Sequence, residues 1–154
     1  MSGLYDEDIV LWSERQAVLL RRIASGENVN DQVDWPNIID EVETVGRSER
    51  NALRSHVAVV LEHLIKLSAS PAADPRNGWK TSVRRARIDI GRKLKDSPGL
   101  RSAVAGMILD ETPSARELAA SAMEEYGEAP RAGISAMAFT EDQVLGDWFP
   151  DDGF

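Results

Sequence analysis

The chain contains no cysteine. A disulfide framework and a thiolate metal site are therefore excluded, and this composition fits a reducing cytoplasm. No apolar stretch approaches the roughly 20 residues that a membrane-spanning helix needs. The opening residues, MSGLYDEDIV, lack the basic region and the apolar run of a signal peptide. We expect a cytoplasmic protein that makes no membrane contact.

The sequence also lacks the common catalytic motifs. It has two histidines, and neither lies in an H-E-x-x-H or Glu-x-x-His pattern. It has no glycine-rich phosphate loop and no G-x-S-x-G elbow. These absences weigh against an enzyme, and we expect neither a cofactor nor a bound metal.

The composition is that of one globular domain. The 154 residues are 42% apolar and 29% charged, so the whole chain, residues 1–154, can bury a core of its own. Apolar residues recur at helical spacing, and no β-branched run alternates with a period of two. The sequence predicts an all-α, single-domain bundle of five or six helices around one long central helix.

The central helix is predicted for residues 33–67. Asp34 is a suitable N-cap, and Pro36 suits the first turn because no donor is needed there. Gly46 costs roughly 1 kcal/mol in a helix interior, so the chain could break there and restart with Ser48 as N-cap. The apolar stripe keeps its phase across Gly46, which favours a continuous helix. The stripe that other helices should cover comprises Ile38, Val42, Val45, Ala52, Leu53, Val60, Leu64 and Leu67.

Three polar residues, Glu49, His56 and His63, interrupt this stripe at intervals of seven. Neighbours in this series lie about 10.5 Å apart along the axis, so no two of them can bind one metal ion by themselves. We expect a hydrogen-bonded layer in which His63 bonds to a carboxylate or hydroxyl group on a facing helix. A ligand or metal site completed by another helix is the alternative. Glu41 is a further candidate, although it precedes His56 by too many turns to share an ion with it.

A basic amphipathic helix is predicted for residues 78–95. A solvated face whose bases offset nearby acidic helices is the simpler interpretation, and a nucleic-acid surface is the alternative. The net charge of −8 argues against nonspecific binding of nucleic acid by the whole surface. The candidate anion-binding side chains are Arg84, Arg85, Arg87 and Arg92.

Local signals place the other helices. A first helix is predicted for residues 5–24, with Asp6 as its cap, and residues 68–77 form a connector in which we expect mobility. Ser97 and Pro98 are a strong helix start.

Pro113 should end or kink the helix that starts at Ser97. Thr112 and Pro113 can start another helix, with Leu118, Ala122 and Met123 on its inner face.

The last part of the chain has one short helix and a tail. Thr140 and Gln143 form a capping box, and the helix that it starts should stop at Gly146. The tail, residues 146–154, carries the large rings of Trp148 and Phe149. We expect the tail to pack back onto the bundle, with insertion into a partner's groove as the alternative.

The central segment resembles the signature of the bacterial domain of unknown function 29 family. That signature has an E-E-I-E segment, then G-R-S-E-R, then an aliphatic run that ends in H-L-L-K. The corresponding residues are 40–43 (DEVE), 46–50 (GRSER) and 63–66 (HLIK). Residues 5–6, the Trp79 segment, residues 96–98 and residues 148–150 fall where the family has similar pieces, so the resemblance covers nearly the whole chain. It implies an all-helical fold and no particular activity.

Three functional hypotheses remain. The first is an interaction protein that binds another protein or a second copy of itself. The second is a regulator that places residues 78–95 against nucleic acid, which salt-dependent retention on a DNA column would favour. The third is a metal-dependent enzyme that uses His56, His63 and carboxylates, which a stoichiometric metal in the purified protein would favour.

Overall fold

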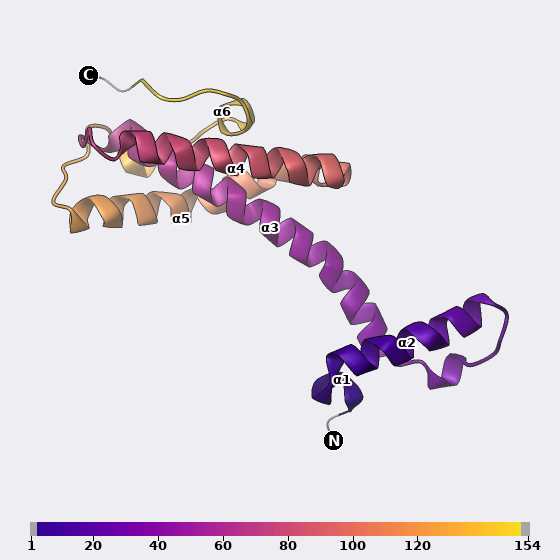
Figure 1. The fold of residues 1–154 in the computed structure, drawn as a ribbon. Coiled ribbons are helices and arrows are strands. Elements are labelled where there is room, and N and C mark those ends of the chain that lie inside the picture. The colour runs from indigo at the N-terminus through magenta and orange to yellow at the C-terminus, as the bar shows by residue number, and fades with distance from the viewer. Residues whose placement is uncertain (1–2, 152–154) are drawn as a thin grey trace. The chain divides into compact units, whose positions relative to one another are not determined.

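The computed structural model describes residues 3–151, and this part of the chain folds into six α-helices and three short 3-10 helices with no strand (Figure 1). The predicted all-α bundle of five or six helices is confirmed. The α-helices are α1 (Leu4–Glu7), α2 (Ile9–Ala24), α3 (Trp35–Ala69), α4 (Arg76–Asp96), α5 (Val104–Glu125) and α6 (Glu141–Leu145). The 3-10 helices are η1 (Asn30–Gln32), η2 (Pro98–Ala103) and η3 (Ile134–Ala136).

Helix α3 is the longest element, at 35 residues, and it passes through Gly46 without interruption. The continuous central helix is therefore confirmed. The residues of α3 belong to two compact units, because the first unit ends at Ser48 and the second begins at Glu49. No helix formed by residues 3–151 is long and apolar enough to cross a membrane.

The first unit is organised around Trp12. The Trp12 indole N–H donates to the Asp34 carboxylate over 2.9 Å, and the Gln16 side chain accepts the Asp34 backbone N–H over 2.8 Å. The Tyr5 ring lies edge-on to Trp12, with 4.8 Å between ring centroids. Hydrogen bonds from Asn37 and then from Trp12 lower the pKa of Asp34. Asp34 therefore caps the start of α3, as the sequence predicts, and also ties α2 to it.

The predicted cap of the first helix is wrong. Asp8, and not Asp6, accepts the Leu11 backbone N–H, over 2.9 Å, and it is the N-cap of α2. The physical reason is that α1 ends at Glu7, and Asp8 then adopts the extended backbone that an N-cap needs. Asp6 lies inside α1, so its helical backbone does not suit that role.

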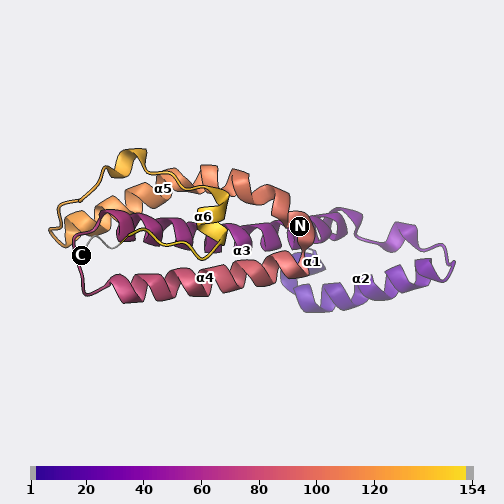
Figure 2. The ribbon, with the colours of Figure 1, turned by 90° about the horizontal axis from the view of Figure 1, so that it is seen from above.

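In the second unit, the later part of α3 lies between α4 and α5 (Figures 1 and 2). The central stripe is buried here, because α4 and α5 each turn an apolar stripe toward it. The fully buried residues of α3 are Leu53, Val57, Val60, Leu61, Leu64, Ile65, Leu67 and Ala69.

Helix α5 passes through Pro113 instead of ending there. Proline removes one backbone bond and costs about 3 kcal/mol in a helix interior, but Pro113 itself is exposed and the buried stripe continues on both sides of it. Packing of that stripe outweighs the local penalty. The stripe comprises Val104, Met107, Ile108, Thr112, Ala115, Ala119 and Met123. Leu118, predicted to face inward, is 56% exposed because it lies outside this stripe.

The short helix α6 starts as the sequence predicts. The Thr140 hydroxyl accepts the Gln143 backbone N–H, and the Gln143 side chain accepts the Thr140 backbone N–H. Val144 is buried, and the helix ends before Gly146. Phe149 packs against the core of the second unit, so the described part of the tail folds back as expected, and residues 152–154 lie outside the described residues.

Candidate functional sites

The polar seam (Glu49, His56 and His63) faces α4 at two of its three positions. The Glu49 carboxylate lies 3.0 Å from the Lys93 ammonium group, and His56 Nδ1 lies 4.0 Å from the Asp89 carboxylate. Lys93 and Asp89 are four residues apart on α4, so they follow one another on the same face. The structure thus brings Glu49 and His56 to a ladder of polar contacts between two helices.

His63 does not take part in this ladder. Its Nδ1 lies 2.8 Å from the Val59 carbonyl oxygen, one turn earlier on α3. A carbonyl can only accept, so Nδ1 carries the proton and donates it. The expected partner on a facing helix is therefore replaced by a backbone carbonyl of the same helix.

Glu41 has its partner within the first unit. It accepts the Tyr5 hydroxyl over 2.5 Å. This bond, and the negative charge beside it, raise the pKa of Tyr5 from 10.0 to about 12. Glu41 therefore anchors the N-terminal helix α1 to α3.

His56 is the one seam residue that lines a small cleft of about 240 Å³, which Ser82, Arg85 and Asp89 also line. This cleft contains one imidazole and one carboxylate as possible metal ligands. Across residues 3–151, no three histidine, aspartate or glutamate side chains converge in a group that could hold a metal ion.

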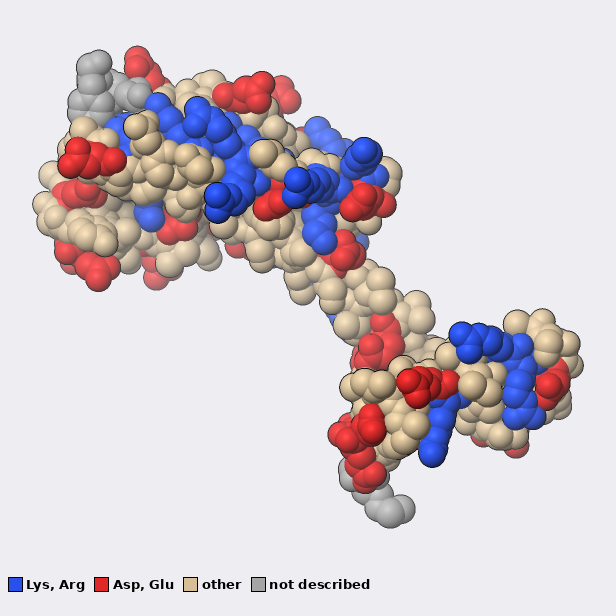
Figure 3. Space-filling model, viewed as in Figure 1, with Lys and Arg blue, Asp and Glu red and all other residues tan. Residues whose placement is uncertain are grey.

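The four candidate anion-binding arginines lie in a band of Lys and Arg side chains along α4 (Figure 3). Arg84 and Arg85 are exposed. Arg92 is also exposed, and its guanidinium lies 3.7 Å from the Asp89 carboxylate. Three of the four side chains are therefore accessible from solvent.

Arg87 differs from the other three because it holds the C-terminal segment. Its guanidinium donates to the carbonyl oxygens of Gln143, Val144 and Trp148 over 2.7, 2.9 and 2.6 Å. It also lies 4.9 Å from the centre of the Phe149 ring. Desolvation by burial lowers the pKa of Arg87, although the nearby Asp147 opposes this shift. Its N–H groups therefore bind the backbone of the C-terminal segment. The sequence around Arg87, a run of basic residues, does not indicate this structural role.

A strip of apolar side chains on α3 is exposed in the first unit. The sequence predicts that other helices cover it, but Val42 is 70% and Val45 is 67% exposed. The described elements of the first unit pack around Asp34, at the start of α3, and leave both valines uncovered. We call the exposed Trp35, Val42 and Val45, together with the half-buried Ile38 that lies between them, the first-unit strip.

Comparison with known proteins yields one family. The family model described as "Domain of unknown function DUF29" matches residues 4–149. No curated protein and no solved structure matches the chain.

Proposed function

Because the chain belongs to the DUF29 family, a domain of unknown function, we propose a function from its surfaces: it is a protein-interaction module that pairs with a second copy of itself through the first-unit strip. The observation that carries this proposal is the exposure of Val42 and Val45 on a helix whose later residues form the core. Large side chains exposed in series along one helix face are typical of interaction surfaces.

The spacing of the strip fits a partner helix. Trp35, Ile38, Val42 and Val45 follow one another at intervals of three, four and three residues. This is the a/d spacing of a heptad, in which side chains of one helix insert between those of a facing helix. A strip of this kind is best covered by another helix that has the same spacing, and α3 of a second copy provides one.

The small core of the first unit supports the same conclusion. Its apolar side chains that are buried in the described chain are Trp12, Val29 and Val33. Units with so little buried apolar area usually need a further source of stability, and oligomerisation is one such source. Pairing along the strip would supply this stability by covering the exposed valines of the first unit.

The charges near the strip permit pairing of two acidic chains. Asp40 and Glu43 each lie 3.4 Å from the Arg47 guanidinium, which partly balances their charges. Glu41 is occupied by Tyr5. Two of the carboxylates near the strip, Asp40 and Glu43, are therefore paired with a base of the same chain, which lowers the repulsion between two copies of net charge −8.

The expected dimer is weak. Burying the exposed part of one valine contributes about 1–2 kcal/mol, so four valines contribute about 4–8 kcal/mol. Association itself costs about 4–15 kcal/mol. The two contributions nearly cancel, so we expect a weak dimer whose net stability depends on burial of Trp35 and Ile38.

Sedimentation equilibrium over a dilution series tests the proposal. The wild type should show a monomer–dimer equilibrium, and Val45→Asp should weaken the dimer by about tenfold or more, which is 1.4 kcal/mol. Val10→Asp is the matched control, because Val10 is 64% exposed in the same unit but lies on α2. A wild type that stays monomeric at every concentration, or equal effects of the two substitutions, would contradict self-pairing.

The exposed bases of α4 support a second candidate function, binding of nucleic acid. Arg84, Arg85 and Arg92 are all exposed and lie on one helix. Changing all three to glutamine should abolish retention on a DNA column and flatten its salt dependence. A wild type that is not retained at low salt would remove this candidate and leave the first.

A further inference from the structure

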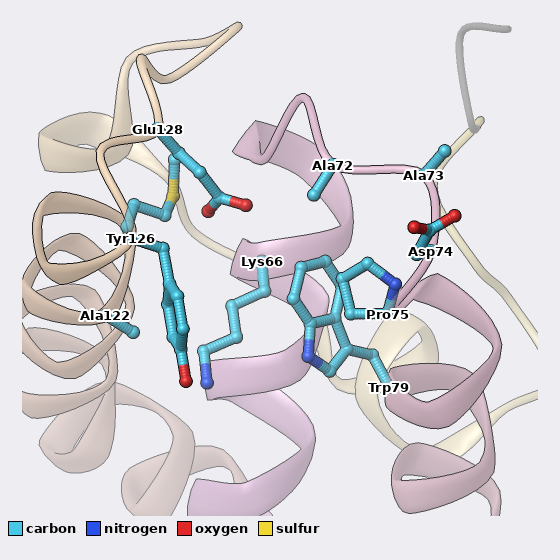
Figure 4. A pocket seen from close by; sticks show the side chains of 10 residues that line it. Lys66, Ala72, Ala73, Asp74, Pro75, Trp79, Ala122, Tyr126 and Glu128 are labelled. Atoms are coloured by element: carbon cyan, nitrogen blue, oxygen red, sulfur yellow. The ribbon is translucent and has the colours of Figure 1, made fainter.

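One cleft of the second unit lies where the end of α3, the start of α4 and the end of α5 meet. Its volume is about 720 Å³, which is within the usual size of small-molecule sites. Trp79 and Tyr126 stand on either side of Lys66 (Figure 4). Tyr126 is 80% exposed although it is large and partly apolar. The cleft therefore offers two aromatic rings to a ligand.

The charge of Lys66 at the floor of the cleft is balanced within the protein. Its ammonium nitrogen lies 3.4 Å from the Glu62 carboxylate one turn earlier, and the two side chains are 16% and 24% exposed. A shielded ion pair of this kind adds little net charge. The other charged groups that line the cleft, Asp74 and Glu128, are both acidic.

Glu128 is placed over the cleft by the way α5 ends. Gly127 has a positive φ of 68°, and the backbone N–H groups of Gly127 and Glu128 donate to the carbonyls of Glu124 and Met123. This is a Schellman motif, which turns the chain back over the last turn of the helix. Glu128 is thereby directed toward the connector between α3 and α4, as Figure 4 shows.

A buried hydroxyl group holds the Glu128 carboxylate in that position. Ser70 is fully buried, and its hydroxyl donates to Glu128 over 3.1 Å. The same oxygen accepts the backbone N–H of Ala72, also over 3.1 Å. The carboxylate is thus positioned from both sides of the cleft, by the end of α5 and by the connector.

We propose that this cleft binds a small organic cation, a molecule with an ammonium group on an apolar body. The faces of Trp79 and Tyr126 attract a cation through their ring quadrupoles, and this attraction is stronger where water is excluded. The carboxylates of Asp74 and Glu128 add electrostatic attraction and repel anions. Because Glu62 already neutralises Lys66, no unpaired lysine competes with the ligand's charge.

Choline and 3,3-dimethylbutanol are suitable probes, since they have nearly the same shape and differ in charge. In a titration followed by the NMR signal of the Trp79 indole N–H, assigned with the Trp79→Phe variant, choline should give a saturable shift. Its affinity should exceed that of the neutral alcohol by about tenfold or more. Equal affinities, or no saturable shift with choline, would overturn the proposal, as would tighter binding of benzoate.

Two variants separate the ligand site from a structural role of its residues. Glu128→Gln keeps an acceptor for the Ser70 hydroxyl and removes the charge, so choline should bind about tenfold more weakly while the fold is retained. Glu117→Gln removes an exposed carboxylate elsewhere on α5 and should leave the affinity unchanged. A loss of equal size in both variants would show general electrostatic attraction and would overturn the assignment of the site. Tyr126→Leu, at an exposed position, should also weaken binding without unfolding the protein.

Discussion

Replacing Arg87 with glutamine should release the C-terminal segment from α4. The guanidinium donates to three backbone carbonyls, those of Gln143, Val144 and Trp148. The bonds to Gln143 and Val144 are partly buried, whereas the bond to Trp148 is exposed. Glutamine is shorter and cannot reach all three oxygens, so partly buried carbonyls would lose their donors.

The expected loss of unfolding free energy follows from these bonds. A partly buried bond from a charged donor contributes roughly 1–2 kcal/mol, and the exposed one contributes little. The two partly buried bonds therefore give about 2–4 kcal/mol, if their effects add. Loss of the contact with the Phe149 ring, 4.9 Å away, acts in the same direction.

Urea unfolding followed by circular dichroism measures the global loss, and hydrogen exchange of the amides in residues 141–149 measures the local one. Arg84→Gln is the matched control, because Arg84 lies 5.1 Å from the same ring but is an exposed residue. The control should change stability by less than about 0.5 kcal/mol. If Arg87→Gln behaves like the control in both measurements, Arg87 does not hold the C-terminal segment.

Three further outcomes are expected. Gly46→Ala should stabilise the protein by about 1 kcal/mol in thermal unfolding, because an added Cβ meets nothing within 4 Å; a destabilised variant would refute a continuous α3. Pro113→Ala should stabilise the protein by up to about 3 kcal/mol, since it restores a backbone donor inside α5, and its melting temperature should rise accordingly. An unchanged or lower melting temperature would show that Pro113 is needed. The pKa of Tyr5 rises from 10.0 to about 12 on folding, so its bond to Glu41 stabilises the first unit below pH 10.0 and is lost as the pH rises through about 12. Tyr5→Phe should remove this alkaline loss from the pH profile of unfolding, and an identical profile in both proteins would show that the bond is not formed.

The candidate sites were only partly predictable, and the reason differs between residues. Glu49 and His56 could be singled out because a polar residue within an apolar stripe needs a partner. Which partner each one finds, Lys93 or Asp89, depends on how α4 lies against α3. The sequence predicts that His63 bonds across the interface, but its partner is the Val59 carbonyl on its own helix.

The corrections to the fold have a common cause. Pro113 was expected to end or kink a helix, and Leu118 to face the core, because both expectations used local preference alone. In the structure, the buried stripe of α5 continues past Pro113 and leaves Leu118 outside it. Val42 and Val45 have the same periodicity as the buried Leu53 and Val60, yet they are exposed. A periodic pattern defines a face of a helix but does not say whether anything covers that face.

The sequence by itself determined the class of fold, the approximate extents of α3 and α4 and the capping box at Thr140, because these depend on groups within a few residues of one another. The tertiary structure alone decided what Arg87 binds and where the Trp79–Tyr126 cleft forms. Arg87 meets carbonyls more than 50 residues further along the chain, and Tyr126 faces Lys66 across a comparable separation (Figure 4). Such contacts depend on how helices pack, and the same local pattern is compatible with many packings until burial of the shared core selects one.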